Sequence, residues 1–125
     1  WEYIHQKKSE GIDIFHCLCP RANLFIENVL PPVEQMIRHD ACLIIGTDSL
    51  ASNYSLSMLE EMKLLLSRFH VTTAQVLQWA TFNGAKALGI EHSHGSFEKT
   101  KTPGVLLLSG IRAEDWSHAA VKRLL

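Results

Sequence analysis

The clearest pattern along the chain is a repeat of apolar positions three and four residues apart between residues 56 and 69. This spacing predicts an amphipathic helix that buries one face against the rest of the protein. The positions that carry the pattern are Leu56, Leu59, Met62, Leu65, Leu66 and Phe69.

A second helix is predicted over residues 72–90. Thr72 or Thr73 can cap its first turn. Gly84 lies near its end and marks a break into a second short helix. The positions predicted to form its buried side are Val76, Leu77, Ala80 and Ala87.

Three short apolar runs predict β-strands. Residues 12–19 (IDIFHCLC) stop at Pro20, which cannot continue a strand ladder. Residues 42–46 (CLIIG) show little alternation, which is typical of a parallel strand covered on both faces. Residues 105–108 predict a third strand after a Pro-Gly turn.

The remaining segments complete an α/β order. Residues 2–9 are polar and predict the tail of a helix closed by Gly11. Residues 20–31 predict a long loop, residues 33–38 a short helix, and residues 113–125 a short helix or a strand. Strands and helices that alternate in this way are typical of an α/β fold.

Composition and charge exclude several classes of protein. A formal net charge of -1 and a pI near 6.7 provide no basic field for nucleic acid or an anionic membrane. No apolar run approaches the roughly 20 residues of a membrane span. Three cysteines are too few for a disulfide framework, so reduced thiols in a cytoplasmic protein are the simpler interpretation. The opening WEYIHQKKSEG has neither Met nor signal-peptide order, which suggests a piece of something longer.

Asp48 is the first candidate for chemistry, because it follows the apolar run ACLIIG directly. One interpretation makes it a turn or helix-capping residue that bonds its own backbone. The other places a carboxylate at the carboxyl end of a parallel strand, where such sheets hold catalytic and metal-binding groups. Gly46 lets the strand end bend closely, and Ser49 adds a hydroxyl to the same loop. The pattern alone leaves both interpretations open.

The segment HCLC invites a zinc interpretation that the spacing does not support. His16 and Cys17 point to opposite sides of a strand, and no second pair of ligands follows later in the sequence. Cys17 and Cys19 are therefore predicted to be small buried apolar residues.

Other titratable residues receive ordinary interpretations. His92 and His94 lie in a turn and are predicted to be solvated. Glu60 and Glu61 are adjacent, about 100° apart on a helix, and are predicted at its solvated or cap-facing edge rather than as an acid/base pair. The sequence also contains no glycine-rich phosphate-binding motif.

Four blocks in order carry a resemblance to a known family. They are LCPRANLFIEN, GTDSLASNYSLSMLEEMK, WATFNGAKALGI and GSFEKTKTPGVLLL. Together they resemble the C-terminal part of the metal-dependent amidohydrolase superfamily, in the branch of the chlorohydrolases, guanine deaminases and adenosylhomocysteine deaminases. The resemblance covers residues 14–125.

The resemblance implies a fold. It is a distorted (β/α)8 TIM-like barrel with a small β-sandwich. Residues 1–98 would supply about strands seven and eight of the barrel with their helices. Residues 99–125 would return to the β-sandwich and form a C-terminal element.

The resemblance also implies roles for single residues. Asp48 would ligate a divalent metal, zinc or else iron, and shuttle the proton of the attacking water. Ser49 and Asn53 would shape its loop or contact substrate, and Asn23 is a further candidate for such contacts. The substrate would be a small molecule with a cyclic amidine, such as a purine or pterin, with no nucleic acid and no membrane as partner; a homodimer fits this pattern too.

Departures from the family pattern limit this picture. The upstream H-x-H pair of metal ligands and the later histidines are absent from these 125 residues. In the family motif H-N-P-x-S-N, Leu18 and Ala22 replace the His and the Ser, while Asn23 is kept; His16 lies on the same strand face as Leu18 and is a weak substitute. One carboxylate cannot hold a catalytic metal, so the chain alone is expected to be inactive and to bind no metal. The alternative is a non-catalytic α/β binding or assembly domain with Asp48 as a structural cap.

The same picture predicts marginal behaviour in solution. Strands without their barrel neighbours present open edges, and open apolar edges associate. The isolated chain is therefore expected to aggregate or to be only marginally stable.

Overall fold

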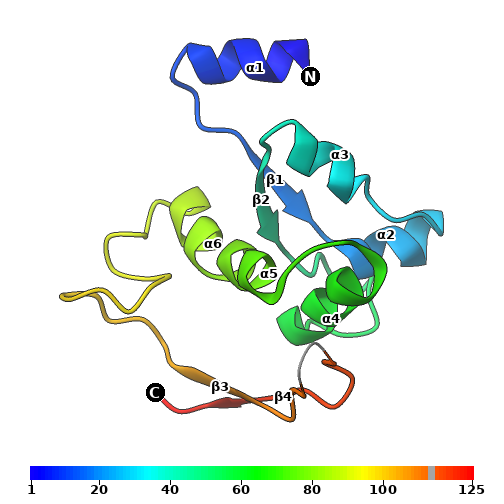
Figure 1. Ribbon diagram of the computed structural model, residues 1–125, viewed down its shortest axis with the longest axis vertical. Coiled ribbons are helices and arrows are strands. Elements are labelled where there is room, and N and C mark those ends of the chain that lie inside the picture. Colours follow the sequence, from blue (N-terminus) through cyan, green and yellow to red (C-terminus); the bar gives the residue numbers. More distant parts are fainter. Residues whose placement is uncertain (113–114) are drawn as a thin grey trace.

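The computed structural model describes residues 1–112 and 115–125, and in this part of the chain helices surround a pair of parallel strands (Figure 1). The helices are α1 (Glu2–Ser9), α2 (Pro20–Glu27), α3 (Val33–Arg38), α4 (Met58–Arg68), α5 (Thr73–Ala80) and α6 (Phe82–Ala87). The strands are β1 (Phe15–Leu18), β2 (Cys42–Ile45), β3 (Leu106–Ser109) and β4 (Ala120–Arg123).

Strands β1 and β2 form a parallel pair, as predicted, but β2 is buried on one face only, at Leu43 and Ile45, so the predicted cover on both faces is wrong. Their register runs from Phe15 opposite Cys42 to Leu18 opposite Ile45. The helices α2 and α3 connect them, so both strands end at the same edge of the pair (Figure 1). The parallel pairing creates the strand-end position that the sequence assigns to Asp48.

One face of this pair is covered by helices and makes the core. Helices α4, α5 and α6 contact β2, and Leu65 and Val76 are fully buried against it. Asn83 donates its side-chain amide to the buried carbonyl of Leu43 at 2.8 Å, which fixes α6 on β2. The core residues are Leu18, Val33, Leu43, Ile45, Leu59, Met62, Leu65, Val76, Trp79, Trp116 and Ala119.

The helix predicted over residues 56–69 is confirmed as α4, and its ends are explained by its caps. It begins after Ser57, whose hydroxyl accepts a hydrogen bond from the Glu60 backbone N–H. The next helix, α5, begins with a complete capping box between Thr72 and Gln75. The break that Gly84 predicts occurs instead at Thr81, whose backbone leaves the helical region.

The predicted loop over residues 20–31 is wrong, because Pro20–Glu27 is helical. Pro20 occupies the first turn, where a missing N–H costs nothing. Asn28 ends the helix in the left-handed conformation at φ 52°. Pro20 and Asn28 thus mark the two ends of a helix and not a loop.

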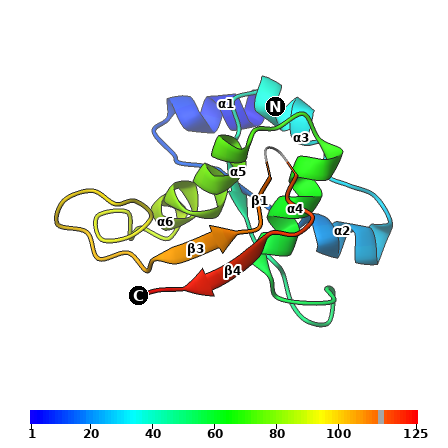
Figure 2. The ribbon, with the colours of Figure 1, turned by 60° about the horizontal axis from the view of Figure 1, so that its bottom comes forward.

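The C-terminal strands form a separate antiparallel pair (Figure 2). The third predicted strand is shifted by one residue to β3, and the ambiguous end of the chain forms a strand, β4. Residues 113 and 114 of that predicted element lie outside the described residues. Trp116 and Ala119, just before β4, join the core. No helix in the described residues is long and apolar enough to cross a membrane.

Candidate active site at the strand ends

Asp48 lies in the loop that follows β2, three residues beyond the last strand residue, Ile45. Its backbone adopts φ 55°, a left-handed conformation that Asp tolerates better than most residues. The side chain of Asp48 is exposed, so its carboxylate is open to water.

Neighbouring hydroxyls hold the Asp48 carboxylate in one orientation. The Ser52 hydroxyl donates to Asp48 Oδ2 at 2.5 Å, and Ser52 is 7% exposed. Ser49 contacts the same hydroxyl, with 3.1 Å between the two Oγ atoms. Asp48 caps no helix, because Ser57 caps α4, the next helix along the chain. A helix-capping role for Asp48 is therefore wrong, whereas its interpretation as a turn residue of a non-catalytic domain stays open. Ser52 orients its carboxylate.

Asn53 fastens the base of this loop. Its side-chain amide donates to the Thr47 carbonyl at 2.9 Å and to Glu61 Oε1 at 2.7 Å. Asn53 is 4% exposed. Both amide hydrogens are thus bonded within the protein, one to the loop after β2 and one to α4.

Glu61 is the residue that the sequence analysis missed. It was predicted at a solvated or cap-facing edge, but its side chain is 0% exposed. Besides Asn53 it accepts a hydrogen bond from the Arg21 backbone N–H at 3.0 Å, in the first turn of α2. The ion pairs of the described residues leave Glu61 without a cationic partner. By contrast Glu60, one residue earlier, pairs with Lys63 at 2.9 Å near the surface.

Two thiols lie beside the Asp48 backbone on the open face. Cys17 Sγ and Cys19 Sγ are 3.9 Å apart. A Cβ on Gly46 would approach these sulfurs to 2.8 and 3.3 Å, so Gly46 is needed for room. Burial, with the nearby Cys17 as a second cause, raises the pKa of Cys19 to about 11. Cys17 is exposed and Cys19 half-buried, which corrects the prediction that both are buried.

His16 and Asn23, the two other candidates near β1, lie apart from this open face. His16 pairs with Leu43, which is 1% exposed beneath the helices, so both side chains lie on the covered face of the strand pair. His16 therefore cannot serve as a ligand on the open face beside Gly46. Its Nε2 is buried without a hydrogen-bond partner among the described residues. Asn23 is half-buried in the first turn of α2. The predicted solvation of His92 and His94 is confirmed.

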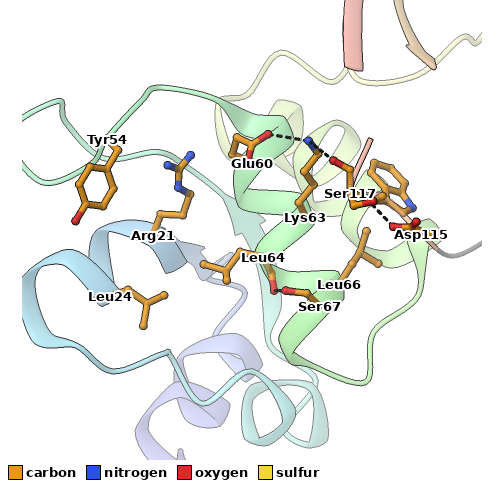
Figure 3. A pocket seen from close by; sticks show the side chains of 11 residues that line it. Arg21, Leu24, Tyr54, Glu60, Lys63, Leu64, Leu66, Ser67, Asp115 and Ser117 are labelled. Atoms are coloured by element: carbon orange, nitrogen blue, oxygen red, sulfur yellow. Dashed lines mark hydrogen bonds and ion pairs between the residues drawn. The ribbon is translucent and has the colours of Figure 1, made fainter. Parts of the chain in front are cut away.

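A groove of the described surface is distinct from Asp48. It lies between α2, α4 and the segment before β4, and Figure 3 shows Arg21 and Lys63 among its lining residues. Arg21 donates to Ser55 Oγ at 3.0 Å, and Lys63 pairs with Glu60 along its rim. Asp48 does not line this groove.

Asp48 can supply one ligand of a metal site, but the side chains around it do not complete such a site. Within the described residues no group of three or more His, Cys, Asp or Glu side chains could hold a metal ion. Asp48 nevertheless has the features of one ligand: an exposed carboxylate, with Oδ2 oriented by Ser52, at the end of a parallel strand.

A parallel strand pair with a carboxylate after its carboxyl end is an arrangement typical of α/β folds. Residues 2–118 match the Amidohydrolase family, and the chain belongs to it. It is 30% identical over 109 residues to 5'-deoxyadenosine deaminase of Methanobrevibacter smithii, covering 81% of this chain and 25% of the relative. It is 33% identical over 116 residues to guanine deaminase of Mus musculus, with 84% and 25% covered.

A solved structure agrees with these relatives. The crystal structure of an adenosine deaminase from Xanthomonas campestris with bound zinc superposes with a TM-score of 0.65 at 31% identity, covering 80% of this chain and 24% of that one. The chain thus spans about a quarter of the length of the relatives it matches. Its likeness to these deaminases confirms the resemblance to the amidohydrolase superfamily and fits a segment of a larger enzyme.

Proposed function

We propose that these residues form the C-terminal part of a metal-dependent hydrolase that deaminates a purine-like ring. In this proposal β1 and β2 are strands seven and eight of a (β/α)8 barrel, and residues 99–125 return to a small β-sandwich. The observation that carries the proposal is the oriented carboxylate of Asp48 at the end of a parallel strand. The deaminases among its relatives support the choice of a purine-like substrate.

The chemistry assigned to this chain is proton transfer by Asp48. A bound zinc or iron ion lowers the pKa of water to about 7 and so supplies hydroxide at neutral pH. Asp48 would be one ligand of that ion and would accept the proton of the attacking water, then return it to the leaving amine. Ser52 holds Oδ2, which leaves Oδ1 without a hydrogen bond from the described residues and open for this exchange.

The remaining parts of the site come from outside this chain. A catalytic metal has three or more protein ligands, and Asp48 supplies one, so the chain alone would be inactive. Asn23 and Ser49 stay candidates for contacts with the substrate. Ammonia release would be the product signal of the intact protein, with guanine, 5'-deoxyadenosine and a pterin as test substrates.

The test compares Asp48→Asn with a matched control in the intact protein. Asp40→Asn is the control, because Asp40 is also exposed and also has a positive φ, 50°. We expect Asp48→Asn to lose bound zinc and to lower kcat by about 10²- to 10⁴-fold, the usual share of an acid/base group, while Asp40→Asn changes neither. Full zinc content and activity in Asp48→Asn would favour a non-catalytic role for this segment.

A further inference from the structure

Glu61 is a carboxylate that the proposed chemistry does not use, although it is completely buried. A buried carboxyl group is tolerated in a fold only where hydrogen bonds compensate for its lost hydration. A leucine in its place would leave the Arg21 N–H and the Asn53 amide without this acceptor. Besides the first turn of α2, Glu61 therefore supports a second segment, the loop after β2.

The hydrogen bonds of Glu61 connect the two strand-end loops to each other. One oxygen accepts from the Arg21 N–H, in the turn of α2 that follows β1. The other accepts from Asn53, which in turn holds the carbonyl of Thr47 after β2. Glu61 itself lies on helix α4, so α2, α4 and the loop after β2 are joined at one carboxylate.

This network ends at Asp48. Thr47 is its direct neighbour in the chain, and Ser52, next to Asn53, donates to Asp48 Oδ2. Asn53 therefore fixes the backbone that precedes Asp48, and Ser52 fixes the Asp48 carboxylate. The left-handed conformation of Asp48 is sparsely populated and persists when its surroundings fix it.

From these contacts we infer that Glu61 is a positioning residue for Asp48. It holds the loop after β2 against the start of α2 and so fixes where the Asp48 carboxylate meets the metal. The inference rests on the proposed function, because it concerns the metal-binding role of Asp48. Glu61 itself touches neither metal nor substrate.

The test is a zinc-affinity measurement on the intact protein with Glu61→Gln. Gln keeps the side-chain volume but has one acceptor oxygen, so either the Arg21 N–H or the Asn53 amide loses its partner. We expect a 10- to 100-fold loss of zinc affinity in competition with a chelator, the usual effect of removing a group that orients a ligand. The kcat should fall with little change in KM.

Two controls separate positioning from general destabilisation. Glu60→Gln makes the same charge change at the neighbouring surface position and should keep zinc affinity. Val76→Ala removes volume from the core, where Val76 is 0% exposed, without touching the loop. It should lower the melting temperature of the metal-free protein while zinc affinity stays at the wild-type value.

The outcomes distinguish this inference from the proposed function. Wild-type zinc affinity in Glu61→Gln, or an equal loss in Val76→Ala, overturns the positioning role even if Asp48→Asn loses zinc. Retention of zinc by Asp48→Asn overturns the proposed function instead. If Glu61→Gln does not fold, Asn53→Ala breaks the same connection from the loop side and should give the same loss of affinity.

Discussion

At the scale of single residues, the surroundings of Asp48 depend on which side chains the fold leaves exposed to solvent. The register of β1 and β2 places Leu18 and Ile45 under the helices. Cys17 and Gly46 lie on the other face, where Asp48 follows. Chemical reactivity should therefore concentrate on this open face.

The two thiols on the open face are predicted to react at different rates. Burial raises the pKa of Cys19 from 9.0 to about 11, so less thiolate is present at neutral pH and alkylation is slowed. Its rate should rise about tenfold per pH unit from pH 8 to 10 as the thiol ionises. Peptide mass spectrometry after iodoacetamide should find exposed Cys17 labelled first; equal labelling at pH 7.5 would contradict this.

Single residues also show what the sequence could and could not predict. Asp48 could be proposed as a candidate because the sequence itself shows a carboxylate directly after an apolar run. Glu61 was missed because the pair Glu60–Glu61 has the same chemistry on both positions, and only the packing of α2 against α4 decides which is buried. The exposure of Cys17 was missed because it depends on which face the helices cover.

At the scale of elements, long periodic segments were predictable and short ones were not. Helix α4 follows from its apolar repeat, and β2 from its apolar run. Helix α2 was predicted as a loop, because its N-terminus is completed by a long-range acceptor, Glu61, that no local pattern contains. Its stability depends on a contact 40 residues away.

The capping box of α5 gives a prediction for an element that is built from local contacts. Thr72→Ala removes the hydroxyl that accepts from the Gln75 N–H at 3.2 Å and should cost about 1 kcal/mol of unfolding free energy. Urea unfolding followed by circular dichroism measures the loss. Thr73→Ala, one position inside the helix, is the control. A loss as large in Thr73→Ala would show that the cap is not the cause.

At the scale of the whole molecule, the described chain leaves much apolar surface and several strand edges uncovered. Each two-stranded sheet has unpaired outer edges within the described residues. On β3 and β4, Leu107 and Val121 are each 48% exposed. Surfaces of this kind pair with other strands.

The 125-residue chain on its own is therefore predicted to self-associate. Light scattering coupled to size-exclusion chromatography should show an apparent mass that rises with protein concentration. The double variant Leu107→Lys and Val121→Lys places charges on the exposed sheet and should lower that mass. A monomeric mass at every concentration, with a cooperative melt, would contradict the prediction.

In the loop after β2, some residues are held by hydrogen bonds and others are exposed to solvent. Thr47, Ser52 and Asn53 are held by hydrogen bonds, whereas Leu50 is 68% exposed. Within the proposed function, a substitution at Leu50 should therefore leave the Asp48 carboxylate in place. Position 50 is accordingly the first to randomise when the surroundings of this carboxylate are to be changed.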